Sequence, residues 1–374
     1  MRRTLEQLIA HDLDQKIVLL SGPRQVGKTT LSRALYPSSM EYFNLDHEQD
    51  RLIVRNQAWS RDSDLVIFDE LHKLRTWKRW LKGIYDTEGV RPRLLATGSA
   101  RLDLYRKGGD SLAGRFFSYR LHPFSVAEVK QELPHQEALE RILRVGGFPE
   151  PFLKGTTTFA KRWQGSVTDR ILHEDIFDIA SVHRVRELET LLEILRHSVG
   201  SPISYDSIAR DLQVSPKTVK QWLTILESLF VIFRVTPYSR KIRRSLLKQP
   251  KIYLYDTGLV VGDDGARFEN AVAGSLLKRL HYIEDTQGEK CQLWYLRDKE
   301  KREVDFLITR DHKPELLLEA KLKDPDPSQL KHFRQYFPQP LPSILLVYEL
   351  RKEMDLDGFI KVRKASKWLS QLET

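Results

Sequence analysis

The stretch Ser21-Gly-Pro-Arg-Gln-Val-Gly-Lys-Thr-Thr30 decides the fold of the amino-terminal part of the chain. It fits the pattern G-x-x-x-x-G-K-[ST]. The apolar run Ile17-Val-Leu-Leu20 before it is typical of a buried strand, and the segment 30–36 after it is typical of a helix. Glycines in such a loop let backbone N–H groups face a polyphosphate, and the following helix adds its positive amino-terminal end. The sequence therefore predicts a nucleotide-binding loop.

The residues of this loop have distinct expected roles. We expect Lys28 to reach the β- and γ-phosphates of ATP, and Thr29 to hold a magnesium ion. The whole expected ATP-binding loop consists of Gly22, Pro23, Arg24, Gln25, Val26, Gly27, Lys28, Thr29 and Thr30.

Two further apolar runs end in polar residues that point to ATP hydrolysis. The run Asp64-Leu-Val-Ile-Phe-Asp-Glu70 ends in two carboxylates. Asp69 fits the carboxylate that helps hold magnesium, and Glu70 fits the general base for the attacking water. The run Arg93-Leu-Leu-Ala-Thr-Gly-Ser99 ends in small polar residues, and either Thr97 or Ser99 is expected to orient that water. The alternative interpretation of residues 69–70 is an acidic turn after a strand.

Composition limits the partners and the location. The chain has 374 residues, which indicates two to four domains, and its formal net charge of +10 favours a polyanionic partner, nucleic acid first and an acidic membrane second. Cys291 is the only cysteine, which excludes an internal disulfide and suits a reducing compartment. No run approaches the length of a membrane span. We therefore expect a cytoplasmic protein that does not contact a membrane.

The order of predicted elements divides the chain into four segments of an α/β protein. Residues 1–122 are expected to form a parallel core with strands near 17–20, 41–45, 64–69, 93–98 and 117–121. The strand at 41–45 is expected to be an extra strand between the phosphate-loop strand and the Asp-Glu strand. Residues 123–197 are mainly helical, broken at 146–151, and are expected to form a lid over the nucleotide. A helical linker without a role in ATP binding is the alternative.

Residues 198–260 have the pattern of a winged helix-turn-helix. A short helix over 204–212, a tight turn and a helix over 216–230 are followed by strands at 231–235 and 251–255. Lys217 and Lys220 lie in the first turns of the second helix, where such folds contact DNA. The loop between the strands carries more cations that are expected to contact DNA, namely Arg240, Lys241, Arg243 and Arg244. A module used only for packing is the alternative.

Residues 261–374 carry a second set of chemically suggestive residues. The predicted order is helix, three strands, helix and strand, with Glu269 on the helix, Asp305 on the second strand, and Glu319 and Lys321 on the third. On a strand, residues i and i+2 face the same side, so Glu319 and Lys321 point together. Asp305 and Glu319 are the expected metal ligands of a magnesium site for phosphodiester cleavage. The alternative is a nuclease-like fold whose site is inactive and used only for binding or assembly.

Taken together, these motifs resemble those of AAA+ ATPases of the AAA_14 type with a carboxy-terminal DUF4143 domain. The matching segments cover nearly the whole chain: 22–30, 68–73, 97–99, 112–115, 146–149, 255–259, 268–270, 304–306 and 319–321. The resemblance implies a P-loop core and a PD-(D/E)XK nuclease-like end, whose site residues match Glu269, Asp305, Glu319 and Lys321. Leu322 departs from the serine that often follows the lysine in similar sequences.

The resemblance also implies assembly and a role. AAA+ subunits form rings, so a homo-oligomer such as a hexamer is expected, with Arg115 as the candidate arginine finger and an internal ion pair of Arg115 as the alternative. The predicted function is ATP-driven remodelling of duplex or branched, Holliday-junction-like DNA in repair or recombination, with metal-dependent DNA cleavage as a second candidate activity. The alternative function is a regulatory ATPase switch in defence or signalling whose nuclease-like fold is catalytically dead.

Overall fold

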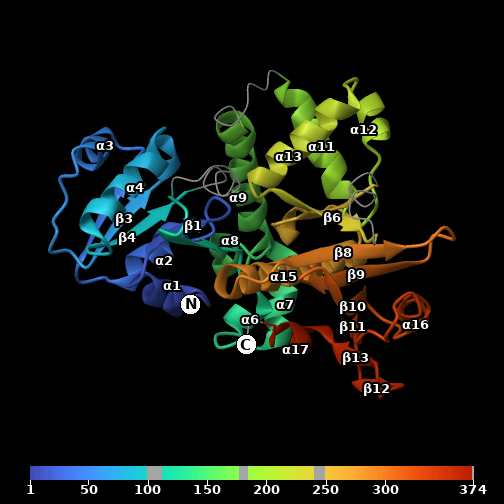
Figure 1. The fold of residues 1–374 in the computed structure, drawn as a ribbon. Coiled ribbons are helices and arrows are strands. Elements are labelled where there is room, and N and C mark those ends of the chain that lie inside the picture. The colour runs from blue at the N-terminus through green and yellow to red at the C-terminus, as the bar shows by residue number, and fades with distance from the viewer. Residues whose placement is uncertain (99–111, 177–183, 240–248, 373–374) are drawn as a thin grey trace. The chain divides into compact units, whose positions relative to one another are not determined.

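The computed structural model describes residues 1–98, 112–176, 184–239 and 249–372, which form two compact units (Figure 1). The first unit comprises Met1–His122 together with Ser228–Phe230. The second comprises Pro123–Glu227 and Val231–Thr374. The predicted division into four segments is finer than these two units, and its boundaries remain predictions.

A five-stranded parallel sheet forms the centre of the first unit, in the order β2-β3-β4-β1-β5. Its strands are β1 (Ile17–Ser21), β2 (Met40–Asn44), β3 (Leu65–Asp69), β4 (Arg93–Thr97) and β5 (Phe116–Arg120). Each observed strand begins and ends within one residue of its predicted range. The predicted fold class, α/β with a parallel core, is therefore confirmed.

One expectation about this sheet is wrong. The strand that lies between β1 and β3 is β4, whereas β2, which comes between them in the sequence, lies at the edge. Every residue of β1, β3 and β4 is buried, while β2 and β5 are half-buried. This pattern follows from position, because an edge strand has a neighbour on one side only.

Helices and aromatic side chains fix the strand that carries the two carboxylates. The unit contains α1 (Glu6–Asp12), α2 (Lys28–Leu35), α3 (Glu48–Arg55), the 3-10 turn η1 (Leu71–Lys73) and α4 (Trp77–Glu88). On β3, the Phe68 ring lies edge-on to Trp59 and Trp80, with centroid separations of 5.2 and 5.1 Å. Each such pair contributes about 0.5–1.5 kcal/mol beyond the apolar area it buries. The strand end at Asp69 is thus held firmly.

The second unit begins with helices. They are α6 (Val126–Val129), α7 (His135–Val145), α8 (Pro149–Lys154), α9 (Thr157–Arg170), the π-helical turn η3 (Ile171–Asp175) and α11 (Val185–His197). The predicted interruption lies between α7 and α8, where Gly146 has φ +85°. A Cβ on Gly146 would stand 1.9 Å from Asp256 Oδ1, so only glycine fits between this turn and that carboxylate.

The predicted helix-turn-helix is α12 (Tyr205–Asp211) followed by α13 (Pro216–Ser228). Ser215 caps α13, since its Oγ accepts a hydrogen bond from the Thr218 N–H at 3.1 Å. The strands β6 (Ile232–Pro237) and β7 (Lys251–Leu254) then pair antiparallel. Helix, turn, helix and strand pair therefore occur in the predicted order.

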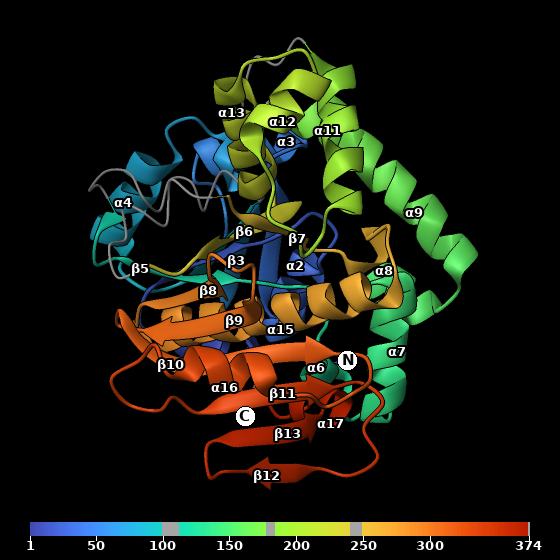
Figure 2. The ribbon, with the colours of Figure 1, turned by 90° about the vertical axis from the view of Figure 1, so that its right-hand side faces the viewer.

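An eight-stranded mixed sheet fills the rest of the unit, in the order β12-β13-β11-β10-β9-β8-β6-β7 (Figure 2). The remaining strands are β8 (Cys291–Arg297), β9 (Glu303–Arg310), β10 (Lys313–Lys321), β11 (Ser343–Val347), β12 (Met354–Leu356) and β13 (Ile360–Lys364). The remaining helical elements are η4 (Thr257–Leu259), α15 (Asp264–Gln287), α16 (Ser328–Arg334) and α17 (Ala365–Leu369). Because β6 pairs in parallel with β8, the strand pair of the predicted wing forms one edge of this sheet.

None of the helices in the described part of the chain is both long and apolar enough to cross a membrane.

Candidate functional site

The phosphate-loop motif forms a tight turn between β1 and α2. Gly22 has φ +144°, and a Cβ there would stand 2.3 Å from the carbonyl oxygen of Leu121. Gly27 is left-handed with φ +97° at the start of α2. Buried Arg3 braces the loop, because its guanidinium donates to the carbonyl oxygens of Val26, at 3.1 Å, and His122. The loop is therefore shaped by two positions that require glycine and by an amino-terminal arginine.

Lys28 lies over this loop. Its ammonium group donates hydrogen bonds to the carbonyl oxygens of Gly22, at 3.0 Å, and Pro23, at 2.7 Å. Only 7% of the residue is exposed. The motif lysine is thus held against the turn that would cradle the phosphates of a nucleotide.

Asp69 is the centre of a hydrogen-bonded cluster where β3 and β4 end. Its Oδ2 accepts from the hydroxyls of Thr29, at 2.8 Å, and Tyr42, and its Oδ1 accepts from the hydroxyl of Thr97. Burial disfavours the charged form, but these hydroxyls and the Lys28 charge outweigh it, so the pKa of Asp69 lies below its usual value. Asp69 is therefore ionised, and it stands beside the motif threonine as predicted.

Glu70 follows Asp69 at the tip of β3 in a left-handed conformation, with φ +58°. Its Oε2 lies 3.4 Å from Nδ1 of buried His72. The carboxylate thus contacts an imidazole that the sequence reasoning did not single out. Glu70 directly follows Asp69, which meets Thr29, and its role as the base stays a prediction.

The other predicted residues of this unit have different outcomes. Thr97 joins the Asp69 cluster, whereas Ser99 lies outside the described residues. Arg115 forms a two-pronged ion pair with Asp86 on α4, with Nε to Oδ1 at 2.6 Å and Nη2 to Oδ2 at 3.2 Å. The internal ion pair, which was the alternative to an arginine finger, is thus present.

Tyr42 is a residue of this site that sequence reasoning missed. It lies on β2, and Arg33 of α2 stands 3.9 Å above its ring. Burial and the hydrogen bond to Asp69 raise the pKa of Tyr42 above its usual value, so its hydroxyl keeps its proton and donates. No local motif marks Tyr42, because its role depends on β2 pairing with β3.

Three family models match consecutive parts of the chain. A family model described as an AAA domain (AAA_14) matches residues 14–130, and one described as a domain of unknown function (DUF4143) matches residues 264–367. Another domain of unknown function (DUF8612) matches residues 136–263. The chain therefore contains the AAA domain of a P-loop ATPase and a DUF4143 domain, in the order that the resemblance predicted.

Similar proteins are distant. An uncharacterized protein of Mycobacterium tuberculosis is 28% identical over 315 residues, covering 80% of this chain and 68% of the relative. An uncharacterized protein of Methanocaldococcus jannaschii is 24% identical over 339 residues, covering 73% of this chain and 70% of the relative. The structure of a Walker-type ATPase of Pyrococcus abyssi matches at 17% identity with a TM-score of 0.42, covering 70% of this chain and 94% of that one.

The predicted metal site of the DUF4143 domain is occupied by a lysine. The Nζ of Lys251, on β7, lies 3.0 Å from Glu269 Oε1, 2.5 Å from Glu303 Oε1 and 3.7 Å from Asp305 Oδ1. Tyr253 donates its hydroxyl to Glu269 Oε1 at 2.6 Å. We call Lys251, Glu269, Glu303 and Asp305 the lysine cluster. Glu269 and Asp305 thus converge as predicted, but around an ammonium group.

Burial and charge set the protonation of the lysine cluster. Lys251 is 1% exposed, and although burial alone disfavours its charge, the surrounding carboxylates raise its pKa above the usual value. Burial, with the nearby Glu269 charge, raises the pKa of Asp305 well above its usual range. Lys251 is therefore charged at neutral pH, and it supplies the positive charge that a metal would otherwise provide.

The second predicted metal ligand, Glu319, does not complete a site. Its Oε1 lies 3.4 Å from Lys321 Nζ, which also donates to the Asp326 carbonyl oxygen at 3.0 Å. Burial raises the pKa of Glu319 to about 7, against the opposing effect of Lys321. Within the described ranges, no three acidic, histidine or cysteine side chains are grouped to hold a metal ion. The residues do not fit the predicted magnesium site, because Lys251 takes the cation's place.

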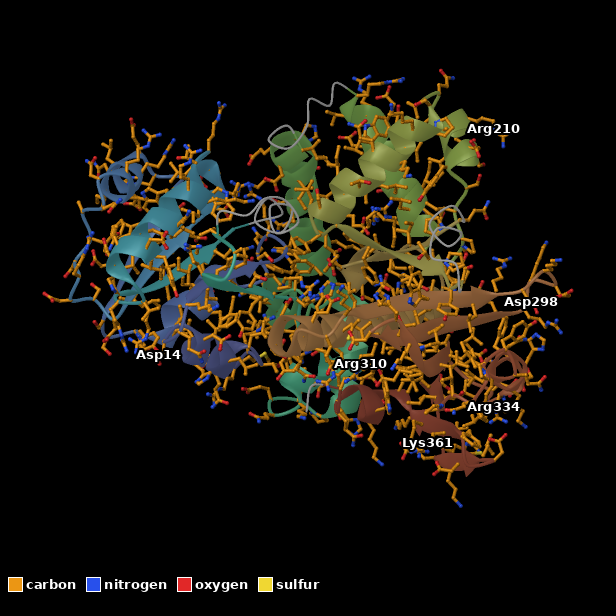
Figure 3. The ribbon with its side chains drawn as sticks, viewed as in Figure 1. Asp14, Arg210, Asp298, Arg310, Arg334 and Lys361 are labelled. Atoms are coloured by element: carbon orange, nitrogen blue, oxygen red, sulfur yellow. The ribbon has the colours of Figure 1, made fainter. Side chains whose placement is uncertain are left out.

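The structure describes only some of the residues that were predicted to contact DNA. Lys217 and Lys220 are exposed on α13, and Arg210 on α12 points outward from the same helix pair (Figure 3). The predicted wing cations all lie outside the described residues, namely Arg240, Lys241, Arg243 and Arg244. The described part of the helix-turn-helix therefore exposes three cations, together with the acids Asp206 and Asp211.

Proposed function

We propose that this P-loop ATPase hydrolyses ATP in its first unit and uses turnover to remodel duplex or branched DNA bound by its second unit. One observation in particular supports the proposal of ATP hydrolysis. The hydroxyls of Thr29 and Thr97 converge on ionised Asp69 directly beside the phosphate loop. Such an arrangement joins the element that binds phosphate to a carboxylate suited to a magnesium ion.

Each residue has one expected task. Thr29 and Asp69 would hold magnesium, which when bound neutralises charge on the phosphates. Lys28 would exchange its bonds to the loop carbonyls for phosphate oxygens. Glu70 would take a proton from the attacking water, and Thr97 and Tyr42 keep Asp69 ionised and oriented.

Variants of Lys28 and Glu70 test these tasks. Lys28→Ala should abolish ATP turnover. Glu70→Gln should keep ATP binding while turnover falls about a hundredfold, because the base is lost. Nucleotide binding and steady-state phosphate release are measured on the same preparations, with Glu48→Gln, an exposed acid on α3, as the matched control. Normal turnover by Glu70→Gln would show that Glu70 is not the base.

The DNA part of the proposal is supported by charge and by the helix-turn-helix. The net charge is +10, and Arg210, Lys217 and Lys220 are exposed on α12 and α13. If the two lysines contact phosphates, Lys217→Ala/Lys220→Ala should flatten the slope of log affinity against log salt by roughly 0.9 per lost contact. The matched control is Lys352→Ala/Lys361→Ala, which removes the same charge near β12 and β13. A slope that is unchanged by the first pair would remove α13 from the interface.

The lysine cluster favours a second candidate for the carboxy-terminal domain. A nuclease needs a cation that activates water, and here Lys251 satisfies the carboxylates instead. We therefore infer a nuclease-like domain that binds or assembles without cutting, as in a regulatory ATPase switch. Incubation of duplex, single-stranded and branched DNA with manganese tests this: the wild type should leave all three intact. Cleavage that disappears in Asp305→Ala would contradict it.

A further inference from the structure

The second unit contains a hollow of about 860 Å³ that neither proposed activity uses. One wall consists of Glu140 and Arg144 of α7 with residues of α9, and the opposite wall comes from the start of α15 and the segments that follow β10 and β11. Figure 2 shows α7, α8 and α9 together on one side of this unit, and α7 packs against both η4 and α15. A volume of this size is typical of sites for small molecules.

The hollow lies where two sequence families meet. The wall formed by α7 and α9 belongs to the segment that the DUF8612 model matches. The opposite wall, from the start of α15 and the segments after β10 and β11, belongs to the segment that the DUF4143 model matches. Both walls are parts of one compact unit. Small-molecule sites occur preferentially at such junctions between structural modules.

The floor of the hollow is fixed by a buried carboxylate. Asp256, 4% exposed, accepts hydrogen bonds from the Gly258 N–H at 3.0 Å and from the Gln164 side-chain amide at 2.9 Å. It also lies against Gly146, as described above. The segments 146–149 and 255–259, to which the ATP site assigns no task, therefore meet here and hold Gln164 in the floor. The carbonyl oxygen of Gln164 is the atom left to accept from a ligand.

One face of α9 and one face of α7 supply the polar groups. Thr157, Ala160, Lys161 and Gln164 are spaced i, i+3, i+4 and i+7, so they share one face of α9. On α7, Arg144 stands four residues after Glu140 and donates to the Gly155 carbonyl oxygen at 3.4 Å. Two helices thus present one cation each to the same hollow.

The residues that line the hollow include four cations, Arg144, Lys161, Arg267 and Lys323, and three acids, Glu140, Asp264 and Glu349, so the lining has a formal charge of +1. Arg267 pairs with Asp264 at 3.5 Å, and Lys323 pairs with Glu349 at 3.0 Å. Arg144 and Lys161 have no carboxylate partner among the described residues. Glu140 lines the same hollow, but its Oε1 accepts from the Gln136 side-chain amide at 3.0 Å and it forms no ion pair with Arg144 in the described structure. The two described cations that have no ion pair therefore favour an anion, and guanidinium and ammonium groups are the usual partners of phosphate.

We propose that this hollow binds a small phosphorylated ligand of nucleotide size. Arg144 and Lys161 contact its phosphate groups, Gln164 accepts from its polar part, and Tyr348 covers an apolar part. This site is separate from the phosphate loop, which lies in the other unit, so it goes beyond the ATP turnover proposed above.

The test uses full-length protein carrying Lys28→Ala, so that binding at the phosphate loop is suppressed. Inorganic pyrophosphate and AMP are titrated by calorimetry, and each should bind saturably at one site. Arg144→Ala/Lys161→Ala should weaken binding about a hundredfold, which corresponds to about tenfold for each lost charged hydrogen bond. The matched control, Lys154→Ala/Arg162→Ala, removes the same charge from exposed positions on α8 and α9 outside the hollow, and should bind as before.

A second variant tests shape rather than charge. Thr157→Trp keeps every cation but fills the hollow from an exposed position, so AMP binding should be lost while the thermal unfolding temperature is kept. Three results would overturn the proposal: no saturable binding of either probe, equal losses in the matched control, or binding only of a DNA oligonucleotide that depends on Arg144 and Lys161. The last result would make this surface a nucleic-acid contact instead.

Discussion

Asp69 shows how one side chain joins separate parts of the ATP site. Three hydroxyls from α2, β2 and β4 donate to it, and each comes from a different segment of the chain. Their combined hydrogen bonds keep the carboxylate ionised although it is buried. The motif residues of this site therefore depend on Tyr42 and Thr97 for their charge state as well as for their position.

Lys251 supplies a prediction at the same scale. Lys251→Ala leaves the half-buried carboxylates of Glu269, Glu303 and Asp305 without their buried cation, so the second unit should lose roughly 3 kcal/mol of stability, the lower end of the range for a broken buried pair. Clustered carboxylates repel unless a cation binds, so manganese should raise the unfolding temperature of this variant in the absence of ATP.

The matched control for Lys251→Ala is Lys321→Ala, which removes a lysine that pairs with only one carboxylate, Glu319. It should show a small loss and no response to manganese. If manganese stabilised the wild type as much as Lys251→Ala, the ammonium group would not be standing in for a metal.

At the scale of helices and strands, the elements that were predicted correctly are those whose ends are marked by neighbouring residues in the sequence. The strands β1, β3 and β4 are apolar runs that end at polar residues, and Ser215 with Pro216 marks the start of α13, so these elements were predictable. The strands β12 and β13 and the helix α17 were missed. They are short, and β12 has only three residues, none of them buried.

Long-range pairing could not be predicted in the same way. Lys251 stands beside a basic stretch of sequence, where a solvated cation is the natural expectation. It is buried because β7 extends the eight-stranded sheet and brings it against α15 and β9, whose carboxylates are remote in sequence. The role of Tyr42 depends on β2 in the same way. In both sites the motif residues were predicted, and the residues that set their charge were not.

Asp256, which precedes η4 and accepts a hydrogen bond from Gln164 of α9, supplies a prediction about pH. Burial raises the pKa of Asp256 to about 6, well above the ordinary value of 3.8, although the Gly258 N–H and Gln164 oppose the rise. Because the folded state holds this proton more tightly than the unfolded state, Asp256 destabilises the fold as pH rises from about 4 to about 6. The total effect is about 3 kcal/mol.

Replacing this carboxyl removes the effect. Asp256→Asn should abolish that part of the decline, so the difference in unfolding free energy between variant and wild type should change with pH over this interval and be constant above pH 7. Denaturant unfolding at a series of pH values measures it. A difference that is independent of pH would show that Asp256 does not titrate in this interval.

At the scale of the whole molecule, the chemistry is divided between the two compact units. The phosphate loop, Asp69 and Glu70 lie in the first, while the helix-turn-helix, the lysine cluster and the hollow lie in the second. ATP turnover that serves DNA remodelling therefore requires that DNA bound to the second unit changes the rate in the first. A coupling of this kind appears as a change in turnover when DNA is added.

The most direct test of this account measures steady-state ATP turnover at fixed salt with no DNA, with linear duplex and with a four-way junction. The account predicts that DNA raises the rate, and that Lys217→Ala/Lys220→Ala lowers this stimulation while leaving the rate without DNA unchanged. A rate that is the same in all three conditions, with DNA binding demonstrated at that salt concentration, would contradict DNA remodelling and leave the regulatory switch as the function.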